Sequence, residues 1–283
     1  GATDRPGGTL PAELLQREGF GADMLEGFLR PFLAGVFLER ELQTSARRLA
    51  FVWDHFRRGQ ACLPTAGMGA IPAQLAADLP DEALRLAAPV QAVSATGVDV
   101  GDVHVSAEQV VLAVEEPAAR RLLELPAGHP GRTVTNLHYA VDEAPQEGPW
   151  LVLNGEGHGP VNDLCVTSEV AAEYAPAGSS AVSVSVLGPE AERPGAELDG
   201  AVRQQLQDWY GAAVQDWSLL SVDRVRAALP VPVSGSDVRR VAESRGLFIC
   251  GDHVEGASIE QALGSGRRLG ERLATLEPTL SVR

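Results

Sequence analysis

The fold is decided by residues 246–274, which read GLFICGDHVEGASIEQALGSGRRLGERLA. The apolar run from Leu247 to Cys250 is bracketed by glycines, which favours a short buried strand over a helix. This strand ends at Gly251-Asp252, and a turn or loop is expected through Gly256. The stretch therefore begins as the last strand of a sheet and ends that strand on an acidic residue.

A helix is expected directly after this loop. Apolar residues recur at helical spacing from Ser258 onward, and serine is a preferred N-cap residue, with Gln261 at the position that closes a capping box. The helix then points its N-terminus at the end of the strand. The free backbone N–H groups and the positive end of the helix dipole at such a helix N-terminus can bind a phosphate, a ribityl chain or a flavin oxygen. The alternative is an ordinary strand and C-terminal helix, in which Asp252 is a turn residue.

These residues resemble the C-terminal signature of the flavoprotein superfamily that contains phytoene desaturases, carotenoid isomerases, protoporphyrinogen oxidases and amine oxidases. The family pattern is an apolar strand, Gly-Asp, a variable loop, Ser-Ile-Glu-Gly-Ala-Leu and Ser-Gly-Arg-Arg. This chain has Gly251-Asp252, then SIEQAL at 258–263 and SGRR at 265–268. The resemblance implies an FAD site formed by Gly251, Asp252, Ser258 and Ile259, in which Asp252 contacts the ribityl-phosphate region and the backbone near Ile259 meets the flavin ring. Gln261 departs from the family glycine.

Two further segments carry the same resemblance. Gly67-Met68-Gly69, ahead of a helix expected through Leu79, resembles an internal Gly-Gly-Met-Gly segment that implies a close approach to the cofactor. The short strands expected over residues 84–114 resemble the family β-meander, which implies that the backbone of Val90 lies against the adenine. The alternatives are a tight turn at the glycines and a plain core position at Val90.

The composition excludes several kinds of chemistry. A formal charge of −15 argues against nucleic acid and anionic membrane surfaces as partners. All 23 basic residues are arginine, so no lysine is present to form a Schiff base or act as a general base. Cys62, Cys165 and Cys250 show no metal-ligand spacing, so no metal is expected. Without paired carboxylates or a nucleophile elbow the catalytic residues stay unknown, and His253 is a candidate either for catalysis or for a simple backbone contact.

Two apolar helices are expected near the N-terminus, over residues 23–37 with a kink at Pro31 and over residues 45–58. Core packing explains them most simply. The functional alternatives are a wall of an apolar substrate tunnel or a face for peripheral contact with a membrane.

The expected fold class is α/β, with mixed α+β character. Strands over 134–141, 150–153, 163–166, 181–186 and 219–225 and a helix over 198–209 indicate a substrate domain with a mixed or antiparallel sheet. We assign residues 1–61 and 127–227 to this domain, and residues 62–126 and 228–283 to the C-terminal part of an FAD-binding domain. The Gly-x-Gly-x-x-Gly unit that begins such flavoproteins is not in the sequence, so the chain alone is expected to retain little or no FAD.

The sequence therefore predicts the C-terminal segment of an FAD-dependent, phytoene dehydrogenase-like oxidoreductase acting on an apolar, isoprenoid-type small molecule. The desaturase-like branch is favoured because amine oxidases have an aromatic residue where Ser258 stands and a lysine near the flavin. The alternative is a cofactor-free binding or interaction module with the same fold. His158 and Asn162 are loop candidates for substrate contact. No signal peptide or membrane-spanning run is evident, so a cytoplasmic location is expected, and the oligomeric state stays open.

Overall fold

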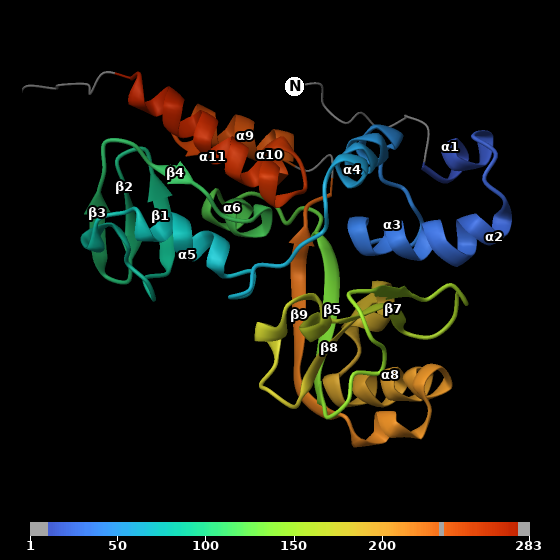
Figure 1. Ribbon diagram of the computed structural model, residues 1–283. Helices are drawn as coiled ribbons and strands as arrows, with labels where there is room; N and C mark the ends of the chain where they lie inside the picture. The colour runs from blue at the N-terminus through green and yellow to red at the C-terminus, as the bar shows by residue number, and fades with distance from the viewer. Residues whose placement is uncertain (1–10, 232–234, 277–283) are drawn as a thin grey trace, which may run out of the picture. The chain divides into compact units, whose positions relative to one another are not determined.

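The computed structural model describes residues 11–231 and 235–276 and confirms the mixed helix-and-sheet fold class. The chain divides into two compact units (Figure 1). Unit 1 contains Gly1–Pro6, Arg85–Arg132 and Ala227–Arg283, and unit 2 contains Gly7–Leu84 and Thr133–Arg226. Residues 62–84, which the sequence analysis placed with the FAD-binding part, thus belong to the same unit as the expected substrate domain. The functional roles of the two units stay predictions.

Unit 1 contains two small sheets. The strands β1 (Val90–Ser94), β2 (Gly97–Val100) and β3 (Val103–Ser106) form an antiparallel meander in the order expected from the turn signals between them. The strands β4 (Val111–Leu112) and β10 (Phe248–Ile249) pair in parallel, with Phe248 opposite Val111 and Ile249 opposite Leu112. The segment that decides the fold is therefore joined to a strand more than 130 residues earlier in the chain.

Helices pack around the parallel pair of unit 1. They are α6 (Glu116–Leu122), α9 (Gly235–Ser244), α10 (Asp252–Glu255) and α11 (Ile259–Ala274). The core between them is formed by fully or nearly fully buried aliphatic residues: Val110, Leu112, Ala119, Leu122, Leu123, Val238, Ala242, Leu247 and Ile249. Neither α6 nor α9 was expected from the sequence. The turn or loop expected through Gly256 takes the form of one helical turn, α10, that begins directly after Gly251.

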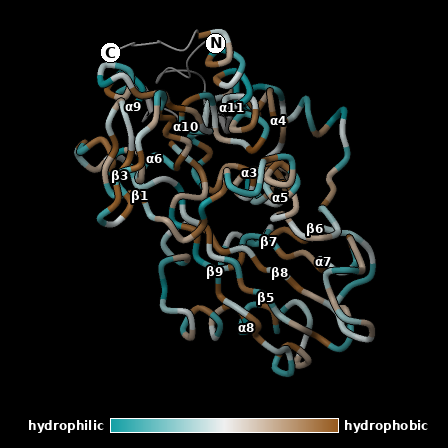
Figure 2. The backbone as a smooth tube through the Cα atoms, turned by 90° about the vertical axis from the view of Figure 1, so that its left-hand side faces the viewer, coloured by the Kyte–Doolittle hydropathy of each residue, from teal (hydrophilic) through white to brown (hydrophobic). Residues whose placement is uncertain are grey.

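Unit 2 is built on a five-stranded sheet with the order β6-β7-β8-β5-β9. The strands are β5 (Arg132–Val141), β6 (Leu151–Leu153), β7 (Val161–Val166), β8 (Ser180–Leu187) and β9 (Ser218–Leu229). The helix α8 (Gly195–Tyr210) packs through Leu198, Val202 and Leu206 on one face, against alternate residues of the strands. Hydrophobic residues recur along β7 and β8, as Figure 2 shows in brown.

The helical part of unit 2 comprises α1 (Pro11–Arg17), α2 (Ala22–Met24), a π-helical turn (Leu25–Leu29), α3 (Arg30–Phe37), α4 (Ala46–Arg58) and α5 (Ala70–Ala77). The irregularity expected at Pro31 takes the form of this π-turn. The Arg30 N–H bonds the carbonyl of Leu25, five residues back. Pro31 follows directly, and because the chain is already helical from Ala22, its missing N–H leaves a carbonyl of the preceding turn without its helical donor.

The remaining elements of unit 2 are single turns: α7 (Thr167–Val170) and the 3₁₀-helices Asp81–Ala83, Ala172–Tyr174, Gly188–Glu192 and Ala212–Asp216. No helix in the described part of the chain combines the length and the apolar character needed to cross a bilayer.

Candidate functional site

The carboxyl ends of β4 and β10 meet at one edge of unit 1. Because the two strands are parallel, the residues that follow them, Glu115 to Pro117 and Asp252, come together. They line a cavity of about 30 Å³ with His129, Gly131, Ala227, Leu229 and Pro230. That volume admits about one water molecule. The described residues thus place Asp252 at a strand-end site but do not by themselves enclose a nucleotide.

Gly251 makes the sharp bend between β10 and α10. Its φ of 142° is a conformation that residues with a Cβ rarely adopt. A Cβ at this position would also lie 3.0 Å from Cε1 and Nδ1 of His253. The Gly251 N–H donates to the Oγ of Ser265, a buried residue of α11, at 3.2 Å. The bend therefore fixes the end of the strand to the middle of the last helix.

Asp252 is the first residue of α10, and its side chain is 31% exposed. Its Oδ1 accepts a hydrogen bond from the backbone N–H of His253 at 2.7 Å. This bond helps to explain why the turn after Gly251 is helical, since it satisfies an N–H group of the first turn. The carboxylate keeps further acceptor capacity toward the cavity that Asp252 lines.

His253 is the least expected feature of the site. Its side chain is fully buried, and neither ring nitrogen has a hydrogen-bond partner in the part of the chain that the structure describes. The nearest carboxylate oxygen, Oδ1 of Asp252, is 3.8 Å from Nδ1, beyond hydrogen-bond distance. Buried polar groups nearly always have partners. The pair of unpartnered nitrogens beside Asp252 is therefore what a site completed by another group would show.

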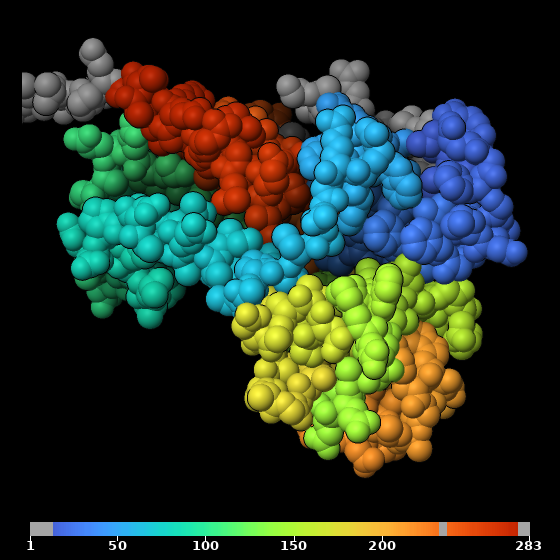
Figure 3. All heavy atoms as spheres, viewed as in Figure 1, coloured from blue at the N-terminus to red at the C-terminus, as the bar shows by residue number. Residues whose placement is uncertain are grey.

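The start of α11 matches the expectation closely. Ser258 is the N-cap, and its Oγ accepts from the N–H of Gln261 at 3.2 Å. The helices α10 and α11 are in contact, so the amide-rich start of α11 lies near the turn that carries Asp252. Ile259 and Leu263 are 54% and 45% exposed. In Figure 3, α11 (red) is open to solvent on the viewed side. The first turn of α11 thus presents N–H groups together with apolar side chains.

The other predicted residues lie apart in the sequence and divide between the units. Val90 begins β1, is half-buried against the core of unit 1, and precedes a β-bulge. Gly67 and Gly69 belong to unit 2, in the turn before α5. Gly67 requires glycine because its φ is 82°, whereas Gly69 is helical with no atom near the position of a Cβ. The structure groups Val90, Gly251, Asp252, Ser258 and Ile259 in unit 1 and the two glycines in unit 2.

The two candidate substrate contacts, His158 and Asn162, both have internal partners, and Asn162 lies in β7 rather than in the expected loop. The amide of Asn162 donates to the carbonyl of Pro31 and to the carboxylate of Asp163, at 3.0 and 2.9 Å. The carbonyl of His158 accepts from the amides of Asn154 and Gln205, while its ring is 71% exposed. Asn162 therefore fastens β7 to α3, and nothing in its contacts singles it out for a ligand.

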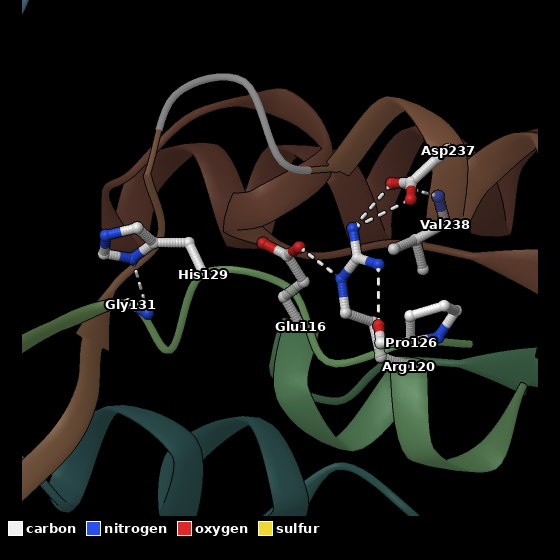
Figure 4. A network of polar contacts seen from close by, with 7 residues as sticks. All are labelled: Glu116, Arg120, Pro126, His129, Gly131, Asp237 and Val238. Carbon is white, nitrogen blue, oxygen red and sulfur yellow. Dashed lines mark hydrogen bonds and ion pairs between the residues drawn. The ribbon is translucent and has the colours of Figure 1, made fainter. Parts of the chain in front are cut away.

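A buried ionic network beside the cavity was missed by the sequence analysis (Figure 4). The Arg120 guanidinium donates to Glu116 at 2.9 Å, to both carboxylate oxygens of Asp237 at 2.7 and 2.9 Å, and to the carbonyl of Pro126 at 3.2 Å. Gly128 lies directly against this guanidinium, where a Cβ would be 2.3 Å from Nε. The network joins α6 to α9 and holds the residues that line the cavity.

The residues present fit the polyhydroxylated part of a flavin nucleotide. Carboxylates such as Asp252 and Glu115 accept hydrogen bonds from hydroxyl groups, and the N–H groups at the start of α11 can donate to oxygen atoms of a ligand. The two unpartnered ring nitrogens of His253 lie at the same turn, packed directly against Gly251. No cluster of three metal-ligating side chains occurs within residues 11–231 and 235–276.

A strand end with a terminal acid, held by the last helix at the edge of a parallel strand pair, is a place where α/β proteins commonly bind nucleotide cofactors. The chain belongs to the flavin containing amine oxidoreductase family, whose sequence profile matches residues 9–273. This match confirms the superfamily resemblance. It does not distinguish the phytoene dehydrogenase-like branch from others.

Solved structures of similar fold agree with this family. An oxidoreductase from Methanosarcina mazei aligns with a TM-score of 0.72 at 15% identity, over 94% of this chain and 69% of its own. A reduced UDP-galactopyranose mutase aligns with a TM-score of 0.66 at 15% identity, over 99% of this chain and 70% of its own. Putrescine oxidase bound to putrescine aligns with a TM-score of 0.52 at 14% identity, over 75% of this chain and 53% of its own.

The chain is shorter than the proteins it matches. It spans between 51% and 70% of the aligned solved chains. A search of curated protein sequences gives no significant match. Because the sequence identities to these structures are low, the alignments support the fold alone.

Proposed function

We propose that this chain supplies part of the cofactor site and the substrate-binding unit of an FAD-dependent oxidoreductase. The observation that carries the proposal is the turn at Gly251-Asp252, which ends β10, packs against α11 and leaves both ring nitrogens of His253 unpartnered. Family membership supports a flavin as the cofactor. When bound, FAD supplies hydride acceptance or donation, which no side chain of this protein can provide.

The residues of the chain then have separate tasks. Asp252 accepts hydrogen bonds from hydroxyl groups of the ribityl chain, and the N–H groups near Ser258 and Ile259 face the flavin end of the cofactor. The exposed apolar side chain of Ile259 keeps water from the same surface once it is covered. Val90, Gly67 and Gly69 complete the proposed set of backbone contacts, by their resemblance to family positions.

The proposed substrate is an apolar small molecule of the isoprenoid type, as in phytoene dehydrogenase-like enzymes. Support comes from aromatic side chains in the helical part of unit 2. Phe32 stacks on Phe28 at 5.7 Å and tilts against Phe56 at 5.2 Å between ring centroids, while Phe28 and Phe56 stay 44% and 47% exposed. A surface of this kind suits an apolar ligand or a peripheral membrane contact. The proposed location is the cytoplasm.

The test is flavin binding by the purified chain, alone and co-expressed with a Rossmann-type N-terminal half. We expect little retained flavin from the chain alone and a stoichiometric yellow complex from the pair. In the complex, Asp252→Ala should weaken FAD binding about tenfold, the effect of one charge-assisted hydrogen bond. The control Asp102→Ala alters an exposed turn of unit 1 and should leave binding unchanged. Equal FAD affinities for the two variants would refute the assignment of Asp252.

The second candidate function is a cofactor-free interaction module. Two observations favour it: Gln261 stands in the first turn of α11, where the family has glycine, and the cavity beside Asp252 has a volume of only about 30 Å³. A co-expressed pair that assembles but stays colourless, even with excess FAD, would support this function over the enzyme.

A further inference from the structure

An open hollow lies on the antiparallel meander of unit 1, which β1, β2 and β3 form (Figure 1). It has a volume of about 400 Å³ and is lined by Thr96, His104, Ser106, Ala107 and Glu108. None of these residues lines the cavity beside Asp252. The hollow is therefore a separate feature of unit 1, and the proposed flavin site gives it no task.

The strand registers place two cross-strand pairs on the outer face of this meander. Gly97 of β2 pairs with Ser106 of β3. Two residues further along β2, Asp99 pairs with His104. Side chains alternate between the faces of a strand, and Val98, between these two positions, packs against the core of unit 1. Both pairs therefore point away from that core.

The imidazole of His104 is held from two sides. Its Nδ1 lies 2.6 Å from Oδ1 of Asp99, which is a hydrogen-bond distance. Its Nε2 and Cε1 lie against Gly97, where an added Cβ would be 2.6 and 2.9 Å from them. Glycine at position 97 therefore leaves the room that the ring occupies. The His104 side chain is still 51% exposed, so a ligand from solvent can reach it.

The contact with Asp99 decides which ring nitrogen of His104 is available. A carboxylate only accepts hydrogen bonds, so Nδ1 carries the hydrogen, and in the neutral ring Nε2 keeps its lone pair. Among the residues that the structure describes, none forms a hydrogen bond with Nε2. His104 lines the hollow whereas Asp99 does not, so the hollow borders the Nε2 side of the ring.

The other groups in the hollow supply oxygen atoms with lone pairs. Glu108 contributes a carboxylate, and Thr96 and Ser106 contribute hydroxyls. The Ala107 N–H donates to the carbonyl of Thr96 at 2.9 Å, which fixes the segment after β3 beside the turn between β1 and β2. None of the described residues that line the hollow is an arginine, and the formal charge of −15 attracts cations to the protein surface. The hollow therefore favours a positively charged ligand.

We propose that this hollow binds a divalent transition-metal ion of the Zn²⁺ type through Nε2 of His104. A histidine that binds a metal usually donates its other ring N–H to a carboxylate or carbonyl, and Asp99 stands in that relation to His104. An imidazole ligand suits Zn²⁺, Ni²⁺ and Cu²⁺, whereas Mg²⁺ prefers oxygen ligands alone. Glu108 is the second side-chain ligand, and water or the hydroxyls of Thr96 and Ser106 fill the remaining positions. With so few side-chain ligands the ion exchanges with solvent, unlike the ion of a closed structural zinc site.

The experiment titrates the purified full chain with zinc chloride and measures binding by isothermal titration calorimetry. Cys62→Ser is the background for every variant, because the exposed thiol of Cys62 would itself bind zinc. His104→Ala should weaken zinc binding by about tenfold or more, since it removes the nitrogen ligand. Asp99→Asn leaves the ligand in place but removes the carboxylate behind the ring, and it should weaken zinc binding about tenfold.

The matched control is His55→Ala. The ring of His55 is exposed, and its Nδ1 is bonded as well, to the carbonyl of Phe51 at 2.8 Å. His55 belongs to α4 in unit 2, so its loss should leave zinc binding as in the background protein.

A second measurement separates metal binding from a merely structural cross-strand pair. Heteronuclear NMR of the ring nitrogens should show the Nδ1–H tautomer of His104 without metal and a shift of Nε2 when zinc is added. Glu108→Gln should weaken zinc binding and leave the tautomer unchanged. No zinc binding by the background protein, equal zinc affinity in His104→Ala, or an Nε2–H tautomer would overturn the proposal. Because neither measurement needs flavin, the outcome does not bear on the FAD site.

Discussion

Gly251 and His253 are packed so closely that only glycine fits between β10 and α10: a Cβ at Gly251 would lie 3.0 Å from two atoms of the buried imidazole. The φ of 142° adds backbone strain to any substitution. Gly251→Ala should therefore lower the free energy of unfolding by about 2 kcal/mol or more, measured by urea denaturation.

The matched control is Gly266→Ala in the interior of α11, where no atom lies within 4 Å of the Cβ position. Alanine is the better helix former there, so this variant should be as stable as the wild type or up to about 1 kcal/mol more stable. Combining Gly251→Ala with His253→Ala should recover part of the loss by removing the clash. A Gly251→Ala protein as stable as Gly266→Ala would show that the turn is not constrained in this way.

Arg120 joins two acidic side chains within one buried network, and breaking it should be costly. The side chains of Arg120 and Glu116 are 10% and 3% exposed. Arg120→Met keeps much of the volume but leaves Glu116 without this charge partner, so a loss of about 3 to 5 kcal/mol in unfolding free energy is expected. The exposed neighbour Arg121→Met serves as control and should change stability by less than about 0.5 kcal/mol.

A double variant tests whether the loss comes from the unpaired charge. Replacing Glu116 by Leu together with Arg120→Met removes both charges from the interior, so the pair should be less destabilised than Arg120→Met alone. If the double variant lost the sum of the two single losses, the charges would be acting independently.

Elements that depend only on residues adjacent in the chain could be predicted from the sequence. The strand at 247–250, the acid that ends it and the Ser258 cap each depend on neighbouring residues, and the structure has a strand at Phe248–Ile249 and the cap as expected. The helix α10 was missed because four residues are too few for a 3.6-residue period to show. The helix α9 carries Val238 and Ala242 at helical spacing, a signal that the preceding proline-rich segment obscured.

Contacts across long sequence separations could not be predicted. Arg120 and Asp237 are 117 residues apart, and nothing in either segment indicates the pairing. The same holds for the row of Asn136, Ser185 and Asp163, since a shift of one residue in register would place different side chains together. The isolation of His253 is likewise a property of tertiary packing, and the sequence supplied only its position beside Asp252.

Ser258 is expected to act mainly by capping α11. Its Oγ accepts from the Gln261 N–H, so Ser258→Ala should cost about 1 kcal/mol in unfolding free energy. Ser258→Asp is the comparison, because aspartate caps equally well and favours the positive end of the helix dipole. Urea denaturation should therefore find Ser258→Asp more stable than Ser258→Ala. In the co-expressed flavin complex the ranking should reverse for FAD affinity, since the added carboxylate would oppose a flavin carbonyl oxygen that accepts from the N–H groups at the helix start.

The raised pKa of Asp163 predicts a specific dependence of the unfolding free energy on pH. Because burial raises its pKa in the folded protein above the unfolded value of about 3.9, the folded state holds the proton more tightly. Its stabilising contribution is then full below pH about 3.9 and is lost as the pH rises through the folded pKa. Asp163→Asn cannot lose that proton, so its unfolding free energy relative to wild type should rise with pH from about 4 upward.

The measurement is urea denaturation of wild type and Asp163→Asn in steps from pH 4 to pH 8, with Asp208→Asn as control because Asp208 is exposed on α8. The Asp163→Asn difference should increase with pH and then level off above the folded pKa, whereas the Asp208→Asn difference should show no such rise. A difference that falls with pH would mean that the hydrogen bonds from Asn162 and Ser185 outweigh burial, and that the carboxyl is held ionised beneath α3.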